Sequence, residues 1–238
     1  METNLTYIYC TIAIGEKYLN SALKFVKDLN SISKTHKVLI VTDIDLDPID
    51  NCVFHKISND EVLFISNYFN YNLKHIPIKI CSELDYQFVF YFDSDWEIDD
   101  LYEESKVLNF LKIFDGSDID FFFERPHYIG AKHDLSTCFW RHKIEPYKLM
   151  ETIKYDNGHV CNEQFLAFKN NDKLKIFCEK WKERNDFGVE KNIWAFAEGL
   201  EIGMSSIDAE MNFSWLGLQN LNSCFKFTSN SGIEYKRF

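Results

Sequence analysis

The sequence lacks the features that mark membrane proteins and disordered proteins. It has no apolar run near the roughly 20 residues that a membrane helix needs, and an acid, Glu2, stands where a signal peptide carries basic residues. Only nine glycines and four prolines occur among the 238 residues, and there is no low-complexity tract. We therefore expect a folded, soluble, cytoplasmic protein with no transmembrane segment.

Basic residues are scarce as well. Lysine and arginine number 26 against 37 acids, the formal net charge is -11, and no basic stripe interrupts the acids. Proteins that follow DNA or RNA neutralise phosphates with clustered basic side chains. Extended nucleic-acid binding is therefore not expected, although a small substrate can still present phosphate to a bound metal ion.

The seven cysteines form no close pair at metal-ligand spacing, and their number is odd. Reduced thiols in a cytosolic protein are the expected state. With 46% hydrophobic residues, residues 1–238 suffice for one domain with one core.

The order of apolar runs predicts an α/β fold with a mainly parallel central sheet flanked by helices. Runs buried on both faces read as strands, and runs with one apolar face at helical spacing read as helices. The first strand, helix and second strand favour parallel pairing with a crossover. The expected strands are Tyr7–Ile14, Lys37–Thr42, Cys52–Ile57, Tyr86–Phe92, Asp120–Glu124, Cys161–Phe168 and Glu201–Ile207. The expected helices are Tyr18–Leu29, Ile78–Leu84, Val107–Phe114, Asp172–Arg184 and Trp194–Gly199.

Two aspartates, Asp93 and Asp95, follow the most strand-like run of the chain. Ligands of open parallel sheets bind beyond the carboxyl ends of strands, so acids placed there face a crevice. Neighbouring carboxylates repel each other unless a cation or hydrogen-bond donors lie between them. Oxygen ligands without nearby Cys or His favour Mg²⁺ or Mn²⁺. The alternative is that the two acids only cap a turn. The metal interpretation requires that the pair face a cavity and not be neutralised by lysine or arginine.

The run Phe92-Asp93-Ser94-Asp95, after an N-terminal strand-helix-strand unit, resembles the Asp-x-Asp motif of GT-A-fold glycosyltransferases. Looser similarity extends over residues 159–181 and 194–212. The resemblance implies a single Rossmann-like domain of the nucleotide-diphospho-sugar transferase fold. Its nucleotide-binding half would span about 1–97 and its acceptor-side half about 98–238. It also implies that Asp93 and Asp95 hold Mn²⁺ or Mg²⁺ on the diphosphate of a nucleotide-sugar donor, with Ser94 between them in the cofactor site.

The same resemblance implies further site residues. Thr11, Ala13 and Asp43, at the ends of the first two strands, would contact the nucleotide, and Lys79 would supply a nearby cation. Asp43 also reads as a turn residue, and Lys79 as a surface lysine.

Catalytic candidates come from the acceptor-side half. Glu163 and Glu198 are candidate general bases for an inverting enzyme, and Glu163 or Gln164 would steady the sugar in a retaining one. His159 is a possible third ligand, but two protein ligands plus water are the default expectation.

The resulting hypothesis is a metal-dependent glycosyltransferase (EC 2.4 type) that moves a sugar, with UDP-sugars favoured, to a hydroxyl of a glycan or another acceptor. Its role would lie in surface glycan or glycoconjugate synthesis. A nucleotidyltransferase of similar fold stays open as an alternative, although only Gly15 stands near the first strand where a glycine-rich phosphate loop is needed. A haloacid-dehalogenase-type phosphatase and a non-catalytic carbohydrate-binding relative are further alternatives.

Overall fold

Strands made almost wholly of buried apolar residues form the centre of the molecule. In the computed structural model, β1 (Tyr7–Ala13), β2 (Val38–Thr42) and β4 (Phe88–Phe92) lie side by side with nearly every side chain buried. Such strands need cover on both faces, which helices provide. The structure describes residues 5–33, 35–58, 60, 71–123, 161, 164–190, 198–214, 221 and 224–227.

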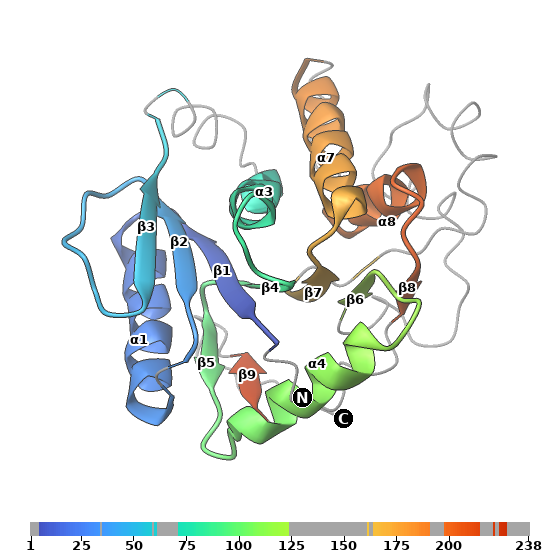
Figure 1. Ribbon diagram of the computed structural model, residues 1–238. Coiled ribbons are helices and arrows are strands. Elements are labelled where there is room, and N and C mark those ends of the chain that lie inside the picture. Colours follow the sequence, from blue (N-terminus) through green and yellow to red (C-terminus); the bar gives the residue numbers. More distant parts are fainter. Residues whose placement is uncertain are drawn as a thin grey trace.

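The central sheet has seven strands in the order β3-β2-β1-β4-β7-β6-β8 (Figure 1). Four neighbouring pairs are parallel, and β7 runs antiparallel to both β4 and β6. The remaining four strands are β3 (Cys52–Lys56), β7 (Phe165–Lys169), β6 (Phe121–Phe123) and β8 (Phe213–Ser214). The predicted α/β fold with a mainly parallel sheet is confirmed.

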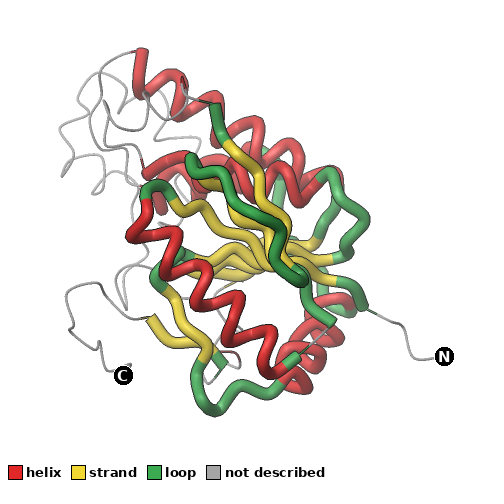
Figure 2. Tube along the Cα trace, turned by 90° about the vertical axis from the view of Figure 1, so that its left-hand side faces the viewer, coloured by secondary structure: helices red, strands yellow, loops and turns green. Residues whose placement is uncertain are grey.

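Helices cover the two faces of the sheet separately (Figures 1 and 2). On one face, α1 (Glu16–Ile32) and α4 (Glu104–Asp115) pack on a core that includes Tyr9, Phe90 and Phe92. On the other face, α3 (His75–Ser82), α7 (Asp172–Glu190) and α8 (Glu198–Asp208) pack on Cys10 and Tyr91. Among the described residues, none of the helices has the length and apolar character to traverse a bilayer.

A small second sheet lies on the α1 side. It pairs β5 (Trp96–Ile98) antiparallel with β9 (Phe225–Phe227), so a late segment of the chain packs beside the residues that follow Asp95. Phe225 reaches the rings of Tyr9 and Phe25 at centroid distances of 6.0 and 6.2 Å. Late and early parts of the chain therefore share one core.

The predictions of a strand at Glu201–Ile207 and of a helix end at Gly199 are wrong. The strand expected at Glu201–Ile207 is part of helix α8, and Gly199 lies in the first turn of that helix instead of ending an earlier one. Residues 201–206 are all buried, polar and apolar alike, so no exposed polar face alternates with a buried one and the sequence shows no helical period. Residues 191–197 lie outside the described part.

The starts of helix α3 and strand β7 also differ from expectation. Helix α3 begins at His75, three residues before the predicted Ile78, because the 3₁₀ turn η1 (Tyr71–Lys74) leads directly into it. Pro77 is tolerated there because the first four amides of a helix have no partner within the helix. Strand β7 begins at Phe165 instead of Cys161.

Candidate functional site

The order of the strands reverses at β1. From β1 the chain proceeds to β2 and β3 on one side of the sheet, and then crosses to β4 on the other side. In open α/β sheets the crevice beyond the carboxyl ends of the strands at such a switch point binds ligands. Asp93 follows β4, and Gly15 follows β1. The acidic motif thus stands at the position that the fold favours for a ligand.

Main-chain hydrogen bonds fix Asp93 on both sides. Its amide donates to the carbonyl oxygen of Gln164 over 2.9 Å, and its own carbonyl accepts the Trp96 amide over 3.0 Å. The first bond continues the β4–β7 ladder, in which Phe92 pairs with Phe165. The second closes a tight turn through Ser94 and Asp95. The predicted candidates Gln164 and Asp93 are therefore direct neighbours.

The side chain of Asp93 has a cationic partner. Lys74 Nζ lies 2.8 Å from Asp93 Oδ1, and the Tyr91 hydroxyl donates to the same oxygen over 3.0 Å. Lys74 ends η1 just before α3, and only 7% of its surface is exposed. The sequence did not single out Lys74, because one lysine between a short 3₁₀ turn and a mostly buried helix belongs to no periodic pattern. The available clue was its place in the chain, shortly before β4.

The folded protein disfavours the charged form of Asp95. Burial raises its pKa to about 6, and the negative charge of Asp93 adds to the increase. A main-chain hydrogen bond and the charges of Lys74 and Lys17 oppose the increase without cancelling it. Asp93 therefore lies close enough for its charge to disfavour ionisation of Asp95.

The aspartate pair meets the requirement for a metal site, that lysine and arginine leave it unneutralised, only in part. Asp93 is neutralised by Lys74, which the metal interpretation did not expect. Burial and the charge of Asp93 keep the pKa of Asp95 raised despite the opposing charges of Lys74 and Lys17. Within the described ranges, no three His, Cys, Asp or Glu side chains come together in a group that would hold a metal ion.

Asp43 lies at the end of β2, beside the start of α1. Its Oδ1 accepts the amide of Gly15 over 2.8 Å. Gly15 precedes the helix with a φ of 80°, a conformation that glycine adopts without strain. Asp43 thus holds the loop between β1 and α1 at the crevice. A nucleotide role for Asp43 stays a prediction.

The other residues predicted to contact the nucleotide-sugar are placed less favourably for that role. Thr11 and Ala13 are fully buried on the α1 side of the sheet, so their side chains offer a ligand no surface. Ser94 is buried within the turn. Lys79 stands in the last turn of α3 and is half-buried, with Cys178 of α7 close enough to feel its charge. Lys74, at the opposite end of this helix, is the lysine that contacts the acidic motif.

Several acceptor-side candidates lie outside the described residues. They include Glu163 and His159. Glu198 is the first residue of α8, and the next residue, Gly199, accepts the amide of Cys161 through its carbonyl over 3.0 Å. The catalytic roles of Glu163, Gln164 and Glu198 stay predictions.

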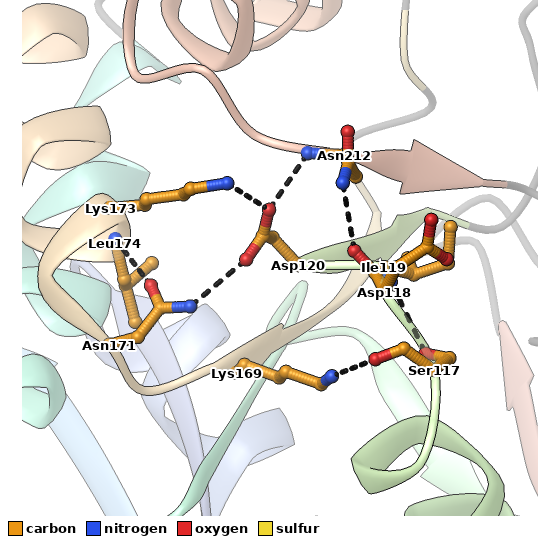
Figure 3. A network of polar contacts seen from close by, with 9 residues as sticks. All are labelled: Ser117, Asp118, Ile119, Asp120, Lys169, Asn171, Lys173, Leu174 and Asn212. Carbon is orange, nitrogen blue, oxygen red and sulfur yellow. Dashed lines mark hydrogen bonds and ion pairs between the residues drawn. The ribbon is translucent and has the colours of Figure 1, made fainter.

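A network of polar contacts around Asp120 lies apart from the acidic motif and links several elements of the fold (Figure 3). Asp120 accepts hydrogen bonds from Asn171 Nδ2 at 3.0 Å, Lys173 Nζ at 2.8 Å and the Asn212 amide at 2.8 Å. Burial opposes ionisation of Asp120, but these donors prevail and lower its pKa. The network joins β6, the start of α7 and the segment before β8, so its role is structural.

Comparison with known proteins supports the fold and no narrower assignment. No family model matches the sequence, and no curated protein matches it. Among solved structures, mouse xyloside xylosyltransferase 1 in its apo form is similar, with 9% sequence identity and a TM-score of 0.50. The match covers 88% of this chain and 84% of that chain. The protein therefore shares its α/β fold with a glycosyltransferase.

Proposed function

We propose that this protein is a metal-dependent glycosyltransferase that transfers a sugar from a nucleotide-sugar, with UDP-sugars favoured, to an acceptor hydroxyl. One observation carries the proposal: Asp93 and Asp95 stand together at the carboxyl end of β4, beside the switch point of the sheet. The shared fold with a xylosyltransferase supports it. A role in surface glycan or glycoconjugate synthesis would follow from such an activity.

The residues present fit a hard divalent cation. Asp93 and Asp95 provide only oxygen ligands, which suit Mn²⁺ or Mg²⁺. Burial first, and the negative charge of Asp93 second, raise the pKa of Asp95, and a cation between the carboxylates would favour its charged form. Two protein ligands leave the other positions to water and to phosphate oxygens, as is usual for Mg²⁺. When bound, the ion would supply Lewis-acid stabilisation of negative charge on the leaving diphosphate.

The chain's own residues would bind and orient the substrates. Lys74 adds a positive charge at the acidic motif, and Asp43 holds the loop that begins α1. Gln164, whose main-chain carbonyl accepts the amide of Asp93, would orient the donor sugar or the acceptor. Glu163 or Glu198 would accept the proton of the acceptor hydroxyl if the reaction inverts the anomeric centre.

A thermal-shift screen of UDP-, GDP- and CMP-sugars, each with and without Mn²⁺, tests the proposal. A ligand at about 100 times its Kd stabilises the native state by about 2.7 kcal/mol, which for a chain of this size raises Tm by about 5 °C or more. We expect that increase for a UDP-sugar only when Mn²⁺ is present. If no nucleotide-sugar raises Tm with the metal present, the proposal is wrong.

A further inference from the structure

The carboxylate of Asp93 is occupied on one oxygen by two donors. Lys74 Nζ lies 2.8 Å from Oδ1, and the Tyr91 hydroxyl lies 3.0 Å from the same atom. The ammonium also stands 5.9 Å from the centroid of the Tyr91 ring. The lysine side chain is 9% exposed and that of Asp93 is 21% exposed, so water screens this ion pair only weakly.

The main chain of each partner is held in place, so only the side chains can rearrange. Asp93 is held through its main chain by Gln164 and Trp96. Lys74 joins η1 to α3, and the helix that follows packs on β1 and α7 through Ile78 and Cys81. Because the ammonium is buried, it needs a negatively charged partner in every conformation of the side chain.

A divalent ion on Asp93 would meet this ammonium at close range. Two cations that share one carboxylate repel each other, and low exposure strengthens the repulsion. The diphosphate of a nucleotide removes the conflict, because it supplies enough negative charge for both cations. Metal and nucleotide should therefore favour each other's binding.

We propose that Lys74 is a built-in counter-ion that makes metal binding at Asp93 depend on the nucleotide. In the free protein Lys74 neutralises Asp93 and keeps the affinity for Mn²⁺ low. When a nucleoside diphosphate enters, Lys74 pairs with a phosphate oxygen, and Asp93 becomes available to the metal. The inference rests on the proposed function, since it concerns the same site.

Linkage sets a quantitative requirement. The factor by which the nucleotide tightens Mn²⁺ binding must equal the factor by which Mn²⁺ tightens nucleotide binding. Removal of the Lys74 charge should raise the affinity of the free protein for Mn²⁺ by on the order of tenfold, within the usual range of couplings between sites. The same change should reduce the mutual enhancement, because the ammonium no longer has to be moved.

The experiment measures free Mn²⁺ by electron paramagnetic resonance during titration of the full chain, with and without UDP. The variants are Lys74→Met, Lys74→Arg, which keeps the charge, and Lys106→Met, which removes a lysine from α4 that pairs with Glu103 at 3.1 Å. We expect tighter Mn²⁺ binding without UDP only in Lys74→Met. Circular dichroism spectra confirm that each variant is folded.

The wild-type protein alone already provides a test, whether or not Lys74→Met folds. Equal Mn²⁺ affinity with and without UDP overturns the inference. Coupling in the wild type that persists unchanged in Lys74→Met, or tightening that Lys106→Met matches, also overturns it while leaving the proposed function intact. If the wild type binds neither UDP nor a nucleotide-sugar at any Mn²⁺ concentration, the proposed function itself fails.

Discussion

The amide of Asp93 lies 2.9 Å from the carbonyl oxygen of Gln164, at the point where β4 and β7 end their antiparallel pairing. Two motifs that are far apart in the sequence therefore meet at one edge of the sheet. The contact uses only main-chain atoms, so the Gln164 side chain can be changed without loss of the bond that positions Asp93.

This arrangement makes Gln164→Ala an informative variant. We expect kcat for sugar transfer to fall by about a hundredfold, as when one positioned hydrogen-bonding group is removed from an active site. Tm should change little, because the residue is only partly buried and its carbonyl is kept. Steady-state kinetics and a melting curve together check this. Unchanged kcat would show that the side chain takes no part in the reaction.

Asp95→Asn should stabilise the protein at neutral pH. The pKa of Asp95 is about 6 in the folded state against an ordinary value of 3.8, so above pH 6 the folded state carries a charge that burial and Asp93 disfavour. Replacing it with a neutral amide should raise Tm at pH 7.5 by a few degrees. After allowance for partial solvent screening this corresponds to about 1 kcal/mol.

The pH dependence gives the check on that variant. An acid with a raised folded pKa contributes stability that is complete below its unfolded pKa and is lost as pH rises through the folded value. The difference in Tm between Asp95→Asn and the parent should therefore vanish between pH 6 and pH 4. A difference that stays constant over this range would contradict the assignment of the shift to Asp95.

Asp120→Ala should destabilise the fold. It removes the acceptor of Asn171, Lys173 and the Asn212 amide and leaves these donors without their partner (Figure 3). We expect a loss of about 2 kcal/mol in the free energy of unfolding, measured by urea denaturation. Asp118→Ala is the matched control, because that side chain is exposed and only its main-chain carbonyl accepts Asn212 Nδ2. Equal losses in the two variants would show that the network does not stabilise the protein.

The parts of the fold that were predicted correctly are those with an unambiguous pattern. Strands β1, β2 and β4 are short apolar runs closed by Gly15, Asp43 and Asp93, and such runs in an α/β order have few alternatives. Helix α1 shows one buried face and one exposed face, which is the pattern that indicates a helix.

The prediction for helix α8 failed because tertiary contacts, and not a local sequence pattern, determine its structure. Glu201 is fully buried and accepts the Trp181 indole N–H at 3.0 Å, a contact between two helices that no local pattern records. Ser205 and Ser206 are fully buried as well, although polar residues normally indicate an exposed face. Tertiary packing here overrides the periodicity.

In the site, too, features set by a local sequence pattern were predicted and features set by tertiary packing were not. The position of Asp93 and Asp95 at a strand end followed from the apolar run before them. The ion pair between Lys74 and Asp93 could not be predicted from the sequence, because it depends on how η1 and α3 pack against β4. The sequence pointed to Lys79, whereas the structure brings Lys74 to the motif.

The most direct measurement of the central claim is the affinity for UDP in the presence of Mn²⁺, determined by isothermal titration calorimetry for the parent and for Asp93→Ala. If Asp93 holds a divalent ion on the diphosphate, the variant should bind UDP at least about tenfold more weakly with Mn²⁺ present, as expected when one ligand of a metal site is lost. Equal affinity in the two proteins would contradict the claim that this carboxylate holds the metal.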